Sequence, residues 1–268
     1  MTSGNRGSVN SHASGKQAPL AALTRIIGLP ILRVMLSQPD TTSVAALSSR
    51  LATVRARLSE AAISAERDPA LITLVAVSKT HDRRAVDAAV AAGLLHFGEN
   101  RVQEAMDKFA DRPTGVRLHI IGRLQTNKAR DAVAAADVIE VLDRPALADA
   151  IASAADRLGR CPRLLIQVNT GAEPQKGGVA LAGAPTFITE MRRRFGDALT
   201  GLMCIPPAGV DPVPHFQTLA DLARRSGLER LSMGMSGDFE AAIAFGATSI
   251  RVGSAIFGTR LREMQATA

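Results

Sequence analysis

The sequence predicts a single (β/α)8 barrel, because eight short apolar runs alternate with eight helical segments within about 200 residues. Most of the runs are continuously apolar, which is typical of parallel strands buried on both faces. Polar or glycine residues follow most of them, as expected where the carboxyl ends of barrel strands form a site. An open doubly wound sheet is the alternative. It requires a glycine-rich turn after the first strand, where this chain has Ser78-Lys79-Thr80.

In chain order, the first predicted element is an extra helix over residues 43–66, where apolar residues recur at helical spacing after a Ser/Thr cap region. The predicted strands are the apolar runs 71–78, 94–97, 117–121, 137–141, 163–169, 199–203, 230–233 and 248–252. The Ala-rich segments between them predict helices near 82–92, 100–109, 125–136, 145–159, 184–195, 212–226, 238–245 and 255–264.

The first 42 residues differ from the rest in composition. Residues 1–19 are rich in Ser, Gly and Asn, and the apolar run 20–36 is interrupted by Arg, Gly and Pro. Such a run is too short and too broken to span a membrane, and no small-residue cleavage site follows it. We therefore expect a disordered extension over 1–42, with Met35 as an alternative start, and the barrel domain over 43–268.

Composition excludes several classes of function. The chain has 268 residues, a net charge of +7, five His and two Cys. Its Lys and Arg are scattered and only 3% of its residues are aromatic, which argues against a nucleic-acid partner. The His and Cys residues match no metal-ligand spacing, so no metal site is expected. Cys161 and Cys204 lie far apart in the chain, so a reducing cytoplasmic setting is the default.

Lys79 follows directly after the first predicted strand, LITLVAVS. Partial desolvation at a barrel mouth lowers the pKa of a lysine and favours the neutral amine, the nucleophile that forms a Schiff base with an aldehyde. A solvated lysine at the barrel rim is the alternative interpretation.

Ser236, Gly253 and Ser254 follow the last two predicted strands, where phosphate sites recur in this fold. Backbone N–H groups, hydroxyls and a helix N-terminus would hold a phosphate there. Taken singly, each residue also suits a tight turn. Arg251 lies two residues before Gly253 and therefore shares its strand face.

A lysine, a phosphate site and a cation beside the ring together describe a site for pyridoxal 5′-phosphate (PLP). Because arginine stays protonated, Arg251 would donate to the pyridine nitrogen and leave the ring a poor electron sink. Strong carbanion chemistry would then be disfavoured.

Six motifs carry a resemblance to a known family. LVAVSKTH, FGENRVQEAMDK, LHIIGRLQTNK, QVNTGAEPQKGGV, GLMCIPP and LSMGMSGDFEAAIAFGATSIRVGSAIFG occur in the order seen in the pyridoxal phosphate homeostasis protein family, over about residues 45–262. The resemblance implies the alanine racemase-like barrel of fold type III PLP proteins, without the second domain of the racemases.

The resemblance also implies roles for individual residues. It implies that Lys79 holds PLP covalently, that the Ser236 loop with Met235 and Gly253-Ser254 contact the phosphate, and that Arg251 contacts the ring nitrogen. The resemblance further places four residues in the lining of the pocket: Asn100, His119, Asn169 and Met203.

The function implied is PLP binding in intracellular homeostasis with little or no turnover. The protein would be a cytoplasmic monomer, with apo PLP-dependent enzymes as recipients of the cofactor. An amino-acid racemase is the alternative, but two-base racemisation needs a second acid/base, which is a Tyr of another domain in alanine racemases. This chain contains no Tyr, and His119 or a cysteine would have to substitute. A cofactor-free lysine aldolase is a further alternative, although it would not need both phosphate loops together with Arg251.

Overall fold

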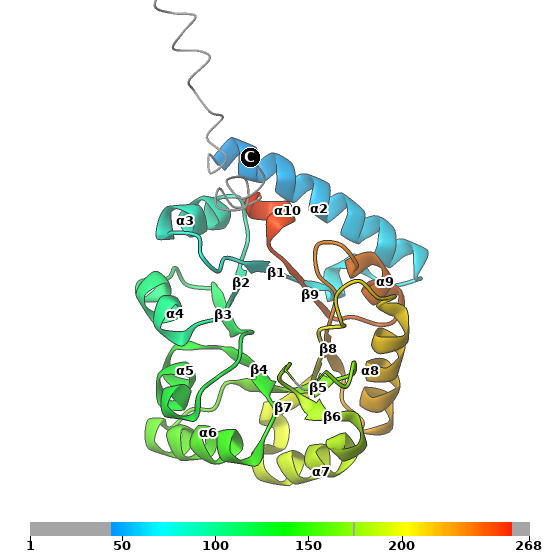
Figure 1. The fold of residues 1–268 in the computed structure, drawn as a ribbon. Coiled ribbons are helices and arrows are strands. Elements are labelled where there is room, and N and C mark those ends of the chain that lie inside the picture. Colours follow the sequence, from blue (N-terminus) through cyan, green and yellow to red (C-terminus); the bar gives the residue numbers. More distant parts are fainter. Residues whose placement is uncertain (1–43, 174, 259–268) are drawn as a thin grey trace, which may run out of the picture. The chain divides into compact units, whose positions relative to one another are not determined.

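Eight parallel strands close into a barrel in the computed structural model, which describes residues 44–173 and 175–258 (Figure 1). The strands follow one another around the barrel in chain order, and β1 closes the ring by pairing with β9. They are β1 (Thr73–Val77), β2 (His96–Glu99), β3 (Arg117–Ile120), β4 (Val138–Leu142), β5 (Arg163–Asn169), β7 (Leu199–Met203), β8 (Arg230–Ser232) and β9 (Ser249–Val252). The predicted barrel is therefore confirmed. The sequence did not predict the two-residue strand β6 (Val179–Ala180), which pairs with β5.

Helices surround the barrel, and each predicted helix has a counterpart (Figure 1). They are α2 (Val44–Ser64), α3 (Arg83–Ala91), α4 (Val102–Phe109), α5 (Ala129–Ala135), α6 (Pro145–Leu158), α7 (Ala184–Phe195), α8 (Val213–Arg225), α9 (Phe239–Ala244) and α10 (Ser254–Phe257). A 3-10 turn at Thr126–Lys128 forms the start of the predicted helix 125–136.

Local sequence explains where these helices begin, end and pack. The Asp82 carboxylate accepts the Ala85 N–H and caps the start of α3, while Gly159, with φ of 62°, ends α6. The extra helix α2 buries one apolar stripe, from Leu47 to Ala62, and lies against α3, α9 and α10. Burial of that stripe packs α2 onto the layer of helices outside the barrel.

Alternate residues of each strand point into the barrel, and they divide its interior between two ends. On β9, Ser249 lines a cavity at the amino ends of the strands, whereas Arg251 lines one at the carboxyl ends. On β5, Arg163 and Gln167 are divided in the same way. We call these the amino-end cavity and the carboxyl-end cavity.

Some predictions fall outside the described residues: the disordered extension 1–42, the start at Met35 and the last part of helix 255–264. Among the described residues, no helix combines the length and the apolar character needed to cross a membrane.

Candidate functional site

The carboxyl-end cavity, of about 550 Å³, brings together residues from distant parts of the chain. This volume suits a small cofactor. Eight of the ten predicted site residues line it: Lys79, Asn100, Asn169, Met235, Ser236, Arg251, Gly253 and Ser254.

Lys79 lies at the carboxyl end of β1, where its side chain is half-buried. Its ammonium group forms no hydrogen bond or ion pair with any residue of 44–173 or 175–258. The next residue, Thr80, has a positive φ of 68°, which is uncommon for a residue other than glycine. An unpaired amine next to a strained backbone position is an arrangement found at ligand sites.

A buried charge cluster fixes the backbone on both sides of Lys79. The Lys108 ammonium donates to the Ser78 carbonyl at 2.8 Å, to Glu99 at 2.8 Å and to Glu104 at 2.9 Å. The Ser78 hydroxyl donates to Glu99 Oε1 at 2.6 Å, and the Thr80 N–H donates to Glu104 Oε1 at 2.7 Å. Burial raises the pKa of the fully buried Glu99, and the bonds from Lys108 and Ser78 act against that rise.

Two serines meet across the loops that follow β8 and β9. The Ser254 and Ser236 hydroxyl oxygens are 3.4 Å apart, and both line the carboxyl-end cavity. Gly234 fixes the turn that leads to Ser236, because its φ is 89° and an added Cβ would lie 2.6 Å from the Ala242 Cβ. The Gly234 carbonyl also accepts the Arg251 N–H at 3.0 Å, which ties this loop to β9.

Arg251 is only 4% exposed, and two hydrogen bonds fix its guanidinium group. Its guanidinium donates to the Ser232 hydroxyl at 2.7 Å and to the Cys204 carbonyl at 2.9 Å. The Ser232 hydroxyl donates in turn to Glu140 Oε2 at 2.6 Å. Burial would raise the pKa of Glu140, but the hydrogen bond and charge of His119 and the charge of Arg251 outweigh burial and lower it. Glu140 therefore holds the Ser232 hydroxyl, which in turn holds the guanidinium of Arg251, a lining residue of the carboxyl-end cavity.

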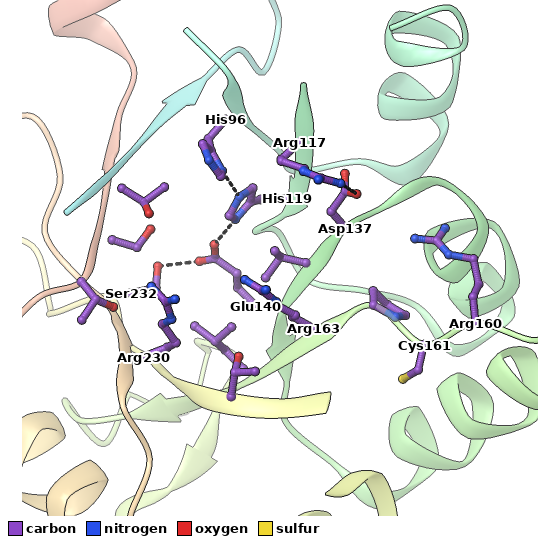
Figure 2. A pocket seen from close by; sticks show the side chains of 17 residues that line it. His96, Arg117, His119, Asp137, Glu140, Arg160, Cys161, Arg163, Arg230 and Ser232 are labelled. Carbon is purple, nitrogen blue, oxygen red and sulfur yellow. Dashed lines mark hydrogen bonds and ion pairs between the residues drawn. The ribbon is translucent and has the colours of Figure 1, made fainter. Parts of the chain in front are cut away.

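His119 and Met203 were also predicted to line the pocket, but the structure places them elsewhere. Met203 is fully buried in the barrel. His119 lines the amino-end cavity, where it bonds Glu140 at 2.7 Å (Figure 2). It lies only two residues before Ile121, which does line the carboxyl-end cavity. His119 therefore lies one layer of inward-facing side chains closer to the amino ends of the strands than predicted.

Three polar residues of the carboxyl-end cavity were missed in the sequence. They are Arg123, Gln167 and Lys176. Gln167 could have been found, since it lies two residues before Asn169 on the same face of β5. Lys176 follows β5 in a loop of no regular spacing, and it is paired with Glu173 at 2.6 Å.

The comparisons with known proteins agree on one family. The family model for the alanine racemase N-terminal domain matches residues 49–261. The pyridoxal phosphate homeostasis protein of Pseudomonas aeruginosa is 39% identical over 224 residues, covering 80% of this chain and 96% of that protein. The protein of the same name from Escherichia coli is 38% identical, covering 80% and 97%. The chain belongs to the pyridoxal phosphate homeostasis protein family.

Solved structures extend this comparison. PipY of Synechococcus elongatus with PLP bound is 37% identical, with a TM-score of 0.68, covering 79% of this chain and 100% of that one. An alanine racemase from Clostridium difficile is 12% identical, with a TM-score of 0.60. At that identity the comparison shows the fold alone. This chain covers 53% of that racemase chain, compared with nearly all of each homeostasis protein.

The cavity supports binding more readily than proton transfer. Its titratable lining residues are Lys79, Arg123, Lys176 and Arg251, and no Asp, Glu, His, Cys or Tyr lines it within the described part of the chain. Nor do the described residues contain a group of three or more His, Cys, Asp or Glu side chains that could hold a metal ion. The donors present suit an anionic ligand with an aldehyde and a hydrogen-bond acceptor.

Proposed function

We propose that this protein binds PLP in the carboxyl-end cavity, linked as a Schiff base to Lys79, and holds the cofactor with little or no turnover. The observation that carries the proposal is the lining of one cavity by an unpaired lysine, two facing serines and a buried arginine. The PLP bound to PipY, and the name shared by the relatives, point the same way.

The residues present fit the chemical groups of PLP. The Ser236 and Ser254 hydroxyls and the nearby backbone would donate to the phosphate. The neutral Lys79 amine would condense with the aldehyde, forming a C=N link and releasing the carbonyl oxygen as water, and this link is the one from which PLP chemistry starts when the cofactor is bound. Arg251 would donate to the ring nitrogen and, because it stays protonated, would keep that nitrogen an acceptor. Asn100, Asn169, Met235 and Gly253 would complete the binding surface.

The alternative of a racemase has little support in the cavity. A second acid/base would have to face Lys79, and the residues considered as substitutes for tyrosine lie elsewhere. His119 and Cys161 line the amino-end cavity. Cys204 is fully buried, and burial raises the pKa of its thiol to about 12. The remaining amine, Lys176, is engaged by Glu173.

The cellular setting is part of the proposal. We place the protein in the cytoplasm as a monomer that releases PLP to apo PLP-dependent enzymes. The two cysteines are free, which suits a reducing compartment. Neither nucleic acid nor membrane is proposed as a partner.

The experiment is a PLP titration followed by visible absorbance, with alanine racemisation assayed in parallel. The parent protein and the Lys176→Ala control should develop the colour of the lysine–cofactor link, and Lys79→Ala should not. Ser236→Ala/Ser254→Ala should weaken PLP affinity about tenfold or more, through loss of two charge-assisted hydrogen bonds. A protein that stays colourless at saturating PLP would refute the binding proposal. Racemisation at roughly 1–10³ s⁻¹ would refute the claim of little turnover.

A further inference from the structure

The amino-end cavity is unusual for a barrel of this kind. The interior of a (β/α)8 barrel is ordinarily filled by layers of bulky apolar side chains. Here the first inward positions of β3, β5 and β8 are Arg117, Arg163 and Arg230, and that of β2 is His96. They surround a cavity of about 450 Å³, which falls in the size range of small-molecule sites (Figure 2).

Two of these arginines are not neutralised. The carboxylates that line the cavity are Asp137 and Glu140. Asp137 pairs with Arg117 at 3.1 Å and with Arg112 at 3.0 Å. Arg163 and Arg230 form no ion pair or hydrogen bond with any residue that the structure describes. Both side chains are exposed at the rim of the cavity, which therefore carries two positive charges that no described side chain neutralises.

The other polar groups are either already bonded or free to donate. Glu140 accepts bonds from His119 and Ser232, and Arg160 donates to three carbonyls at the end of α5. Ser249 lines the same cavity, and its buried hydroxyl has no hydrogen-bond partner in the described part of the chain. A free hydroxyl donor beside two free guanidinium groups is suited to an oxyanion.

We propose that the amino-end cavity is a second ligand site, which binds a small phosphate monoester through Arg163, Arg230 and Ser249. Planar guanidinium groups bind phosphate oxygens through paired, charge-assisted hydrogen bonds. A phosphate monoester carries nearly two negative charges at neutral pH, which matches the two unpaired arginines. The apolar walls formed by Pro162, Leu165 and Val138 would receive the organic part of the ligand.

His96 provides a reporter inside this cavity. Its Nδ1 lies 3.1 Å from His119 Nε2, at the start of the hydrogen-bonded chain that continues through Glu140 to Ser232 (Figure 2). The Ser232 hydroxyl in turn accepts a hydrogen bond from Arg251. Burial, then His119, Arg117 and Arg163, lower the pKa of His96 to about 4, while Asp137 acts in the opposite direction. A bound anion favours the protonated imidazole, so it should raise this pKa.

The test is a titration of PLP-saturated protein with inorganic phosphate and, separately, with glycerol 3-phosphate. Binding is followed by calorimetry and by the imidazole NMR signals of His96. We expect the monoester to bind more tightly than inorganic phosphate and to raise the pKa of His96. Arg163→Gln/Arg230→Gln should weaken binding at least about tenfold and leave PLP colour unchanged. Arg157→Gln/Arg193→Gln is the matched control, since it removes two exposed arginines that line neither cavity.

Three other outcomes would overturn the proposal. Equal loss of binding in the control pair would mean a general charge effect. Loss in Ser236→Ala/Ser254→Ala, with retention in Arg163→Gln/Arg230→Gln, would mean that phosphate binds only in the cofactor cavity. Absence of binding by either probe would mean that there is no site. Failure of the protein to take up PLP would refute the proposed function, but it would not alter the comparison between the two arginine pairs.

Discussion

Replacing Lys108 with Met removes the ammonium group that lies 2.8 Å from the buried Glu99 carboxylate, but it keeps an apolar stem of similar length. Lys108 is 6% exposed and Glu99 is fully buried, so water cannot replace the lost partner. Breaking such a pair on one side costs about 3–5 kcal/mol, within a typical total of about 5–15 kcal/mol. For a domain of this size we expect the melting temperature to fall by about 6–20 °C. Thermal and urea unfolding, followed by circular dichroism, measure both quantities.

Two controls isolate the buried pair. Lys128→Met removes a cation from an exposed pair with Asp131 at 3.8 Å and should change stability by less than about 0.5 kcal/mol. Glu99→Gln/Lys108→Met removes both buried charges and should recover most of the loss. If Lys108→Met cost no more than Lys128→Met, or if the double variant were no more stable than Lys108→Met, the reasoning would be refuted.

The loss should also depend on pH. Burial raises the pKa of Glu99 in the folded protein, and removing Lys108 takes away a group that opposes this rise. The folded variant would then bind a proton more tightly than its unfolded chain, so its stability falls as pH rises above the unfolded value of about 4.3. The deficit of Lys108→Met relative to the parent should therefore be larger at pH 8 than at pH 5. A deficit independent of pH would mean that packing, and not charge, explains the loss.

Three further predictions concern other parts of the barrel. Gly234→Ala should lower both stability and PLP affinity, because φ is 89° and the new Cβ would lie 2.6 Å from the Ala242 Cβ; unchanged unfolding and PLP titration curves would contradict this. In the folded protein at pH 8, iodoacetamide should label the exposed Cys161 and spare Cys204, because burial raises the pKa of the Cys204 thiol to about 12. The unfolded protein should be labelled at both cysteines, and mass spectrometry distinguishes these outcomes. Burial and neighbouring cations lower the pKa of His96 from 6.5 to about 4, so this imidazole should stay neutral in the folded protein at pH 5.5. Its contribution to stability should be lost as pH falls from 6.5 toward 4. An NMR titration midpoint near 6.5 would contradict this prediction.

The fold could be predicted from the sequence because its signals are local and repeated. Runs such as LITLVAVS and RLLIQVN identify parallel strands by composition, and the chain order of βα units leaves few topologies. The two-residue strand β6 could not be predicted, since a pair of residues carries no periodicity. It exists because Val168 and Asn169 of β5 offer it a neighbouring edge.

Site residues that directly follow a strand could be predicted, but the depth at which a strand residue lies inside the barrel could not. Lys79, Arg251 and the two serines follow their strands directly, so the barrel brings them together. Placing His119 required the register between neighbouring strands, because one layer decides which cavity a side chain enters. The charge cluster around Lys108 could not be predicted from the sequence. A lysine in the last turn of a helix such as α4 is ordinarily solvated, and only the contact with Glu99 of β2 shows that Lys108 is buried.

Borohydride reduction of the PLP-loaded protein, followed by peptide mapping, tests the central claim most directly. Reduction makes the lysine–cofactor link permanent, so the labelled residue identifies the amine that held the aldehyde. The structure predicts a single label on Lys79, because its ammonium is unpaired in the carboxyl-end cavity while Lys176 in the same cavity is paired with Glu173. A label on Lys176 or on any other lysine, with Lys79 unmodified, would contradict the account.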